Sequence, residues 1–251
     1  MRPPIDTIAA PIFPKDLEWV NVAPLRMEQQ YGRPVLVEFW DFCRPNSVRT
    51  LPYVRAWHER YAAAGLRVIG VHTPGFEPSW DAANVRAAVT RLDVEHPVVL
   101  DPDYAIWNAY ENLGWPARYL FGPELTLAEY HFGEGAYAET ELAIQELLGI
   151  ERDVVEPVRP EDAPDALVAP QTPDQEGPYS GPYAAGAVWG VLEGRGSVRV
   201  NGREIAVEHP GAYALIEHER HTEGVLDLRV SDGVTCHAVC FTPGLTGEAG
   251  L

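Results

Sequence analysis

The chain reads Val35-Leu36-Val37-Glu38-Phe39-Trp40-Asp41-Phe42-Cys43-Arg44-Pro45-Asn46-Ser47 in its N-terminal part. The first six of these residues are apolar or aromatic apart from one glutamate, a composition typical of a buried β-strand. Beyond them, apolar residues recur every three or four positions, at Val48, Leu51, Val54, Trp57 and Tyr61. This spacing predicts a helix over about 47–63 that begins near Asn46 or Ser47, with Pro52 kinking it after its first turn. A strand, a short turn and a helix are therefore expected here.

The first 150 residues continue this alternation of strand and helix patterns. Further strands are expected at Leu66–His72, Pro97–Leu100, Arg118–Phe121 and Leu125–His131. Helical spacing marks three more segments, around residues 85–92, around residues 106–110 and from about Glu139 onward. Such alternation predicts an α/β sheet with helices on both faces. The turn Gly122-Pro123-Glu124 predicts that the last two strands form an antiparallel hairpin at one side.

A different pattern begins after residue 150. Prolines recur throughout residues 151–185 and interrupt any helix or central strand, so we expect a semi-stiff linker there. From 186 to 251 the apolar period becomes two, and Asn201-Gly202 between two alternating runs predicts a hairpin. We therefore expect an α/β domain over 1–150, a Pro-rich linker over 151–185, and a small all-β sandwich or half jelly roll over 186–251.

The composition excludes several classes of partner. Asp and Glu number 37 against 19 Lys and Arg, and the net charge of −18 repels nucleic-acid phosphates and anionic membrane surfaces. No apolar stretch approaches the roughly 20 residues that span a bilayer. Met1–Asp6 lacks the long apolar segment of a secretory signal, so we expect a cytoplasmic protein. An odd count of three cysteines argues against a disulfide framework.

A series of short motifs follows in a fixed order. The stretch Phe39-Trp40…Asn46…Arg49-Thr50-Leu51-Pro52-Tyr53 resembles the motif Phe-Trp-Thr-x-x-Cys-x-Asn-Cys-x-Arg-Thr-Leu-Pro-Tyr of DipZ-type, TlpA-like thioredoxin domains. The similarity continues through Gly70-Val71-His72-Thr73-Pro74, Trp107-Asn108-Ala109-Tyr110, Trp115-Pro116-Ala117-Arg118 and His131-Phe132-Gly133-Glu134-Gly135. It covers about residues 10–150 and implies a thioredoxin-like fold. The tail also resembles the β-rich module that follows thioredoxin in such proteins.

The chemistry that this resemblance implies does not carry over as a whole. The two catalytic cysteines of the family align with Arg44 and Ser47, and Cys43 lies one residue before the first of these positions. A helix N-terminus would lower the pKa of a thiol placed there, but two sulfurs are needed for a disulfide. The resemblance further implies a cis peptide bond at Trp115-Pro116, facing the active turn, and a buried acid at Glu38 beneath it.

Two interpretations remain open for each residue of the turn. Cys43 is either a single reactive thiol, with Arg44 stabilising its thiolate, or a small buried residue at the strand end. Arg44, Asn46 and Ser47 either bind an anionic ligand at the helix N-terminus, or Asn46 or Ser47 caps the helix. Trp115, beside Pro116, is the best candidate for an aromatic side chain that faces a ligand.

The histidines permit a metal interpretation that their spacing does not favour. His72 and His131 match family positions, with Glu38 and Glu134 on nearby segments. They lack helical ligand spacing, and His218-x-x-His221 falls in an expected loop, so we predict no metal site and no cofactor. His72 is retained with Glu38 among the residues expected around the ligand.

Two functions follow from these residues. The first is a redox-inactive thioredoxin-fold protein that binds a peptide, a protein partner or a small ligand at the former active-site cleft. The alternative is a thiol–disulfide oxidoreductase or a peroxidase that uses Cys43 alone. A third expectation, independent of both, is that the exposed strand edges of the β module support a homo-oligomer.

Overall fold

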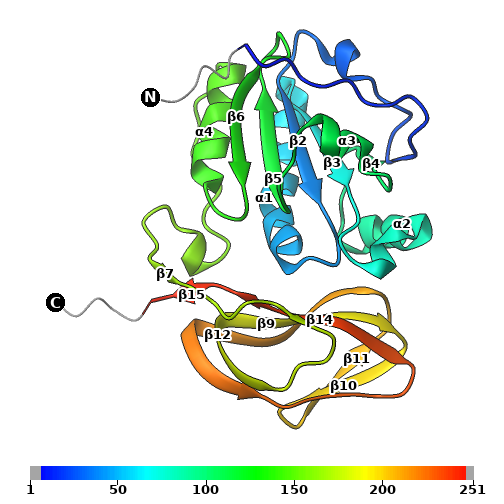
Figure 1. Cartoon of the computed structure of the whole chain (residues 1–251). Coiled ribbons are helices and arrows are strands. Elements are labelled where there is room, and N and C mark those ends of the chain that lie inside the picture. The colour runs from blue at the N-terminus through cyan, green and yellow to red at the C-terminus, as the bar shows by residue number, and fades with distance from the viewer. Residues whose placement is uncertain (1–6, 247–251) are drawn as a thin grey trace, which may run out of the picture. The chain divides into compact units, whose positions relative to one another are not determined.

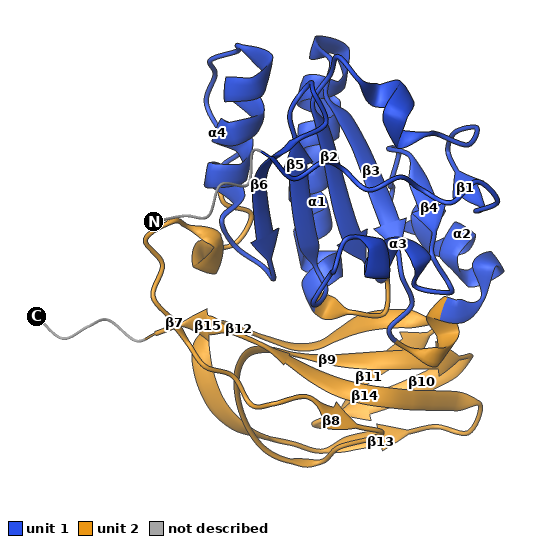
Figure 2. Cartoon of the chain, turned by 45° about the horizontal axis from the view of Figure 1, so that its top comes forward, with its two compact units in different colours: residues 1–41, 46–75, 80–156 blue, residues 42–45, 76–79, 157–251 orange. Residues whose placement is uncertain are grey.

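A computed structural model describes residues 7–246 of the chain. Met1–Asp6, which carries the expectation about a signal sequence, lies outside the described residues. The chain divides into two compact units (Figure 2). Unit 1 comprises residues 1–41, 46–75 and 80–156, and unit 2 comprises residues 42–45, 76–79 and 157–251. In the described part of the chain, no helix is long and apolar enough to cross a membrane.

The centre of unit 1 is a mixed six-stranded sheet with the order β1-β4-β3-β2-β5-β6 (Figure 1). The strands are β1 Trp19–Val20, β2 Val35–Trp40, β3 Arg67–His72, β4 Val98–Leu100, β5 Ala117–Phe121 and β6 Leu127–Phe132. β2, β3 and β4 are parallel, whereas β1, β5 and β6 run antiparallel to their neighbours. The predicted α/β sheet is confirmed, and so is the antiparallel hairpin at its edge.

Alternate residues of β2 enter two separate cores, one on each face of the sheet. Val35, Val37 and Phe39 pack on one face with Ile106 of the short helix α3. Leu36 packs on the other face against helices α1 and α4. A strand buried on both faces has no polar alternation, which explains why residues 35–40 read as a nearly continuous apolar run.

The helices of unit 1 are α1 Pro45–Tyr61, α2 Ala82–Arg91, α3 Ala105–Ala109 and α4 Tyr137–Leu148. Short 3₁₀ turns lie at η1 Met27–Gln30, η2 Ala62–Ala64 and η3 Glu77–Trp80, and a fourth, η4 Pro160–Asp162, lies in unit 2. α1 begins at Pro45, earlier than expected, because proline is well suited to the first helical position. Gly149 ends α4 in a left-handed conformation with a φ of 63°.

Unit 2 is rich in strands that pair antiparallel. A four-stranded sheet has the order β12-β9-β14-β8, a three-stranded sheet has the order β11-β10-β13, and β15 pairs with β7. The strands are β7 Val168–Ala169, β8 Gln175–Glu176, β9 Gly181–Gly194, β10 Gly196–Val200, β11 Arg203–Val207, β12 Gly211–Leu226, β13 Leu228–Val230, β14 Val234–Thr242 and β15 Gly244–Leu245. The two larger sheets share one apolar core, which confirms an all-β fold after the α/β domain.

Two features of unit 2 differ from the expectations. The expected linker over 151–185 contains β7, β8 and the start of β9, because its prolines lie at strand ends and in edge segments that need fewer ladder hydrogen bonds. The loop expected at His218 and His221 is wrong: both lie within β12, in an irregular stretch between Glu217 and Thr222 where the register to β9 shifts.

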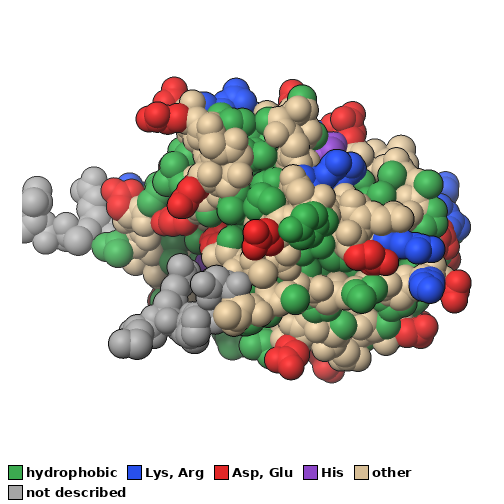
Figure 3. Space-filling view, turned by 90° about the horizontal axis from the view of Figure 1, so that it is seen from above, with side chains coloured by type: hydrophobic (Ala, Val, Ile, Leu, Met, Phe, Trp, Pro, Cys, Tyr) green, Lys and Arg blue, Asp and Glu red, His purple; other side chains and the backbone are tan. Residues whose placement is uncertain are grey.

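The surface is consistent with the acidic composition. On the face that Figure 3 shows, acidic and basic side chains are scattered among apolar ones, and they do not form a continuous basic surface. An acidic chain offers little to a phosphate backbone. The exclusion of nucleic acid remains an expectation from charge.

Candidate functional site

The turn after β2 is built around the buried side chain of Asp41. Its Oδ2 accepts a hydrogen bond of 2.8 Å from the backbone N–H of Gly75, and its Oδ1 lies 3.6 Å from Nε2 of His72. The backbone N–H of Asp41 donates to Oγ of Ser47 at 3.2 Å. The structure therefore brings Ser47 and His72 together at Asp41, a residue that the sequence interpretation did not single out.

The expected capping role of Asn46 or Ser47 is wrong. Both residues lie inside α1, which begins at Pro45, and the hydroxyl of Ser47 points back to the strand end instead of to the helix amides. The reason is that Asp41 presents a buried backbone N–H, which needs an acceptor more than the helix end does. Ser47 thus fastens the turn, whereas the side chain of Asn46 is partly exposed.

Cys43 and Arg44 have different surroundings. Cys43 is fully buried and forms no disulfide. Reactive cysteines are normally partly exposed, so this burial favours the interpretation of Cys43 as a small apolar residue. Arg44 is partly exposed, and its guanidinium carbon lies 5.1 Å from the ring centroid of Phe76.

The Trp115–Pro116 peptide bond is cis, as the resemblance implied. Trp115 is partly exposed and is fixed by a hydrogen bond of 2.9 Å from its indole N–H to the backbone carbonyl of Thr73. The segment before the cis bond is thereby tied to the end of β3. Trp115, the aromatic residue expected to face a ligand, is thus fixed in place and partly exposed.

Further aromatic rings extend from Trp115. Its ring centroid lies 4.3 Å from that of Trp107, and Trp107 in turn contacts Tyr104 at 5.6 Å. Tyr104 lies 5.9 Å from Trp80, which is 53 % exposed. These four aromatic residues, Trp80, Tyr104, Trp107 and Trp115, form one continuous cluster that we call the aromatic cluster.

Glu38 lies fully buried in the middle of the sheet, opposite Arg118 of β5. Burial raises the pKa of Glu38 from 4.5 to about 8, although the positive charge of Arg118 acts in the opposite direction. Neither carboxyl oxygen accepts a hydrogen bond from any residue in the described part of the chain. Glu38 is therefore a protonated acid at neutral pH, and it is the buried acid that the resemblance implied.

Arg118 is itself almost completely buried. Its Nη2 donates to the carbonyl of Gly135 at 2.5 Å, and its guanidinium carbon lies 5.6 Å from the ring of Trp57 and 5.0 Å from that of Tyr137. Burial lowers its pKa from the usual value. Aromatic faces stabilise a cation that lacks full hydrogen bonding, which explains how an arginine is accommodated here.

Comparison with known proteins assigns unit 1. No protein-family model matches the chain. Among solved structures, the thioredoxin-like superfamily protein SPOA0173 is similar, with a TM-score of 0.53 and 20 % identity, covering 59 % of this chain and all of that one. Unit 1 is a thioredoxin-like domain.

Two curated relatives place this thioredoxin-like domain more closely. Protein DipZ of Mycobacterium bovis is 34 % identical over 163 residues, which cover 61 % of this chain and 24 % of that protein. Thiol-disulfide oxidoreductase YkuV of Bacillus subtilis is 25 % identical over 130 residues, covering 52 % of this chain and 87 % of YkuV. These matches confirm the resemblance to DipZ-type and TlpA-like domains. The chain spans about a quarter of the length of DipZ.

Three of the histidines contact other protein groups. His131 Nε2 lies 2.9 Å from the backbone oxygen of Glu134, whose carboxylate is bound by Arg49 Nε at 2.9 Å. Over residues 7–246, no three or more His, Cys, Asp or Glu side chains are arranged to hold a metal ion. In unit 2, His218 contacts the hydroxyl of Tyr183 and His237 contacts Glu193, each at 2.9 Å.

Sequence reasoning missed Asp41 and Arg118. Asp41 had one available signal, since an acid directly after a buried strand is costly unless its oxygens accept hydrogen bonds. Arg118 had a similar signal, since it interrupts the apolar strand Ala117–Phe121. Arg118 belongs to a motif that carries the resemblance, whereas Asp41 falls in the gap between Trp40 and Asn46.

Proposed function

We propose that this thioredoxin-like domain has lost dithiol–disulfide exchange and binds a peptide or small ligand beside cis-Pro116. The observation that carries the proposal is that Arg44 and Ser47 occupy the two positions aligned with the family's cysteines. A disulfide requires two sulfurs with Cα atoms within about 7 Å of each other. A guanidinium and a hydroxyl cannot form one, and the neighbouring thiol of Cys43 is fully buried.

The ligand surface that we propose is the aromatic cluster next to Pro116. Its rings are held in place, because Trp115 donates to Thr73 and the hydroxyl of Tyr104 donates to the carbonyl of Pro74. Rigid, partly exposed aromatic side chains supply contact area at low entropic cost, as ligand and peptide sites require.

The loss of redox chemistry is tested by restoring both sulfurs. We expect the unaltered chain to leave the dithiothreitol-driven reduction of insulin at its background rate. The double substitution Arg44→Cys and Ser47→Cys places two thiols at the start of α1, and we expect it to accelerate insulin reduction. Cys43→Ser is the matched control and should change neither result. Insulin reduction by the unaltered chain, lost on Cys43→Ser, would favour the alternative of a single-thiol oxidoreductase and overturn this proposal.

Ligand binding is tested separately with a phage-displayed library of extended peptides. We expect selection on the full chain to enrich a defined set of sequences, and Trp115→Ala to weaken their binding at least 10-fold, roughly the loss of one anchoring aromatic. Tyr130→Ala is the matched control, because Tyr130 is an exposed aromatic residue on β6 outside the aromatic cluster. Equal losses for both variants, or no enrichment at all, would reject the peptide site.

A further inference from the structure

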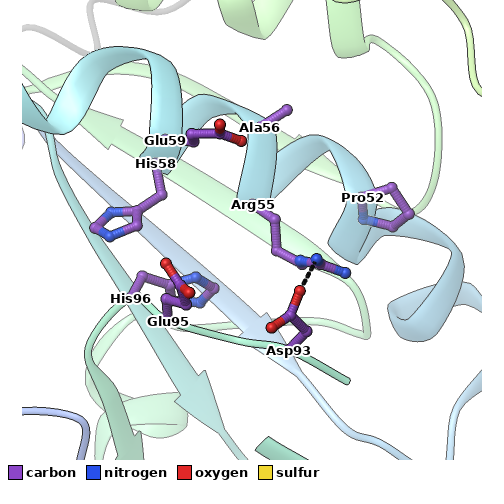
Figure 4. A pocket seen from close by; sticks show the side chains of 8 residues that line it. All are labelled: Pro52, Arg55, Ala56, His58, Glu59, Asp93, Glu95 and His96. Atoms are coloured by element: carbon purple, nitrogen blue, oxygen red, sulfur yellow. Dashed lines mark hydrogen bonds and ion pairs between the residues drawn. The ribbon is translucent and has the colours of Figure 1, made fainter. Parts of the chain in front are cut away.

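A polar pocket lies in the thioredoxin-like domain between α1 and the segment that connects α2 to β4 (Figure 4). Its volume is about 470 Å³. Arg55, His58 and Glu59 enter it from α1, and Asp93, Glu95 and His96 enter it from the connecting segment. None of these residues belongs to the turn or to the aromatic cluster, so the pocket is separate from the site already described.

His96 is the most unusual residue of this pocket. Its side chain is fully buried, and neither ring nitrogen has a hydrogen-bond partner among residues 7–246. Buried polar atoms almost always have partners, so this arrangement calls for a reason. The ring is closely seated, because a Cβ at Gly70 would lie 3.1 Å from Nε2 of His96. The backbone of the segment is also fixed, since Asn21 Nδ2 donates to the carbonyls of Val94 and His96.

A second imidazole faces the first. The ring centroids of His58 and His96 lie 5.9 Å apart with planes at 64°, and Nδ1 of His58 is also buried without a partner in the described part of the chain. Figure 4 shows the His58 ring pointing from the helix toward His96. With Zn–N bonds of about 2.0–2.1 Å, two imidazoles on one ion have centroids roughly 5–6.5 Å apart. The observed separation therefore suits a single bridging ion.

The charge of the pocket favours a cation. Three carboxylates, those of Glu59, Asp93 and Glu95, line it against one guanidinium, and that guanidinium, on Arg55, is already paired with Asp93. Both imidazoles line the pocket, and the side chain of His96 is fully buried there. The charges of Arg67 and Glu95 both act on His58, with opposite signs.

We propose that His58, His96 and the carboxylate of Glu95 bind a divalent transition-metal ion such as Zn²⁺ in this pocket. Two neutral imidazoles and one carboxylate form a donor set that zinc accepts, with water completing the coordination. No three potential ligands among residues 7–246 already converge on one point. Closure of the site consequently requires Glu95, which is exposed, to turn its carboxylate toward the two rings. Side-chain rotations of this kind are common on binding.

Zn²⁺ itself is the probe for the test. The full chain is treated with a chelator and then titrated with Zn²⁺ by calorimetry at pH 7.5. We expect one Zn²⁺ ion to bind per chain, with a dissociation constant below about 10 μM. His58→Ala should weaken this site about 100-fold or more, and Glu95→Gln about 10-fold. His58 lies on the helix surface and is only partly buried, so its removal leaves the fold intact, whereas a change at His96 risks unfolding.

The other histidines require a control. His218 and His221 lie in unit 2 and offer a competing pair of imidazoles. The double variant His218→Ala and His221→Ala should bind Zn²⁺ as the unaltered chain does, and Co²⁺ bound in its place should give visible absorption that disappears in His58→Ala. A dissociation constant above about 10 μM, or a site that survives His58→Ala, would overturn the proposal. These outcomes are independent of insulin reduction and of peptide binding.

Discussion

Replacing Glu38 with glutamine should stabilise this protein increasingly as the pH rises. Glu38 is buried opposite Arg118, and neither of its oxygens has a partner within residues 7–246. Its pKa is raised to about 8 in the folded chain, whereas an unfolded chain has the ordinary value of 4.5. Glutamine has nearly the same volume and does not ionise, so it imitates the protonated form that the fold requires.

The expected size of the effect follows from this difference in pKa. Below pH 4.5 the carboxyl is protonated in both states, and its titration has no effect on the free energy of unfolding. Above that pH the unfolded chain releases the proton and the folded chain keeps it, so stability falls by about 1.4 kcal/mol for each pH unit. The loss reaches about 3.5 kcal/mol at pH 7 and levels off near about 5 kcal/mol above pH 8. Glu38→Gln removes this loss.

Urea unfolding of both proteins between pH 4.5 and pH 9 measures the prediction. The difference in unfolding free energy between variant and unaltered chain cancels the contribution of every other titrating group and should grow by several kcal/mol over that range. Glu146→Gln, at an exposed position on α4, serves as the control and should give a flat difference. A flat difference for Glu38→Gln, or a destabilised variant at pH 7, would mean that Glu38 is ionised and paired with Arg118, and would refute the assignment of a neutral buried acid.

Three further predictions concern other buried polar groups. Glu141→Ala should lower the unfolding free energy by about 3–5 kcal/mol, because Glu141 accepts from Trp57, Tyr61 and the backbone N–H of Val155 and pairs with Arg60; urea titration measures this, and a loss below about 1 kcal/mol would contradict it. His96 has a pKa of about 3 in the folded chain, so the unfolding free energy of the unaltered chain should fall as the pH drops below 6.5. In metal-free protein, His96→Gln should lose about 2 kcal/mol less unfolding free energy than the unaltered chain between pH 6.5 and pH 5. Equal losses in both proteins would count against a neutral His96. Asp101→Ala should cost about 1–2 kcal/mol, because its carboxylate accepts from the backbone amides of Ile106 and Trp107 at the start of α3; unchanged hydrogen exchange at these amides would argue against that role.

The sequence predicts the thioredoxin-like domain well because central strands such as β2 and β5 are buried on both faces. Residues 35–40 match β2 at both ends, since a run bounded by Pro34 and Asp41 leaves little choice of boundary. The start of α1 is less well predicted. Pro45 suits the first helical turn as well as a loop, so the pattern of apolar residues that begins at Val48 places the start too late.

The role of Ser47 in the turn after β2 could not be predicted from the local sequence pattern. Ser47 as a helix cap and Ser47 as an acceptor for Asp41 have the same sequence signature, and only the position of the Asp41 backbone N–H separates them. The strands of residues 168–185 were missed for a similar reason. Proline is unfavourable in the interior of a sheet, so a proline-rich segment does not predict strands. β7 and β8 are nevertheless two-residue strands, because they pair with β15 and β14, which lie far away in the sequence.

Ser47 and Arg44, which occupy the two positions aligned with the family's cysteines, should contribute differently to the unfolding free energy. Single substitutions separate the two contributions. Ser47→Cys replaces the oxygen that accepts from the buried N–H of Asp41 with a weakly accepting sulfur, so it should cost about 1–2 kcal/mol of stability. Arg44→Cys removes a partly exposed guanidinium whose contact with the ring of Phe76 is worth about 0.5–1 kcal/mol. If both single variants cost the same in urea unfolding, Ser47 has no special structural role. A larger cost at Ser47 identifies it as a structural residue of the turn.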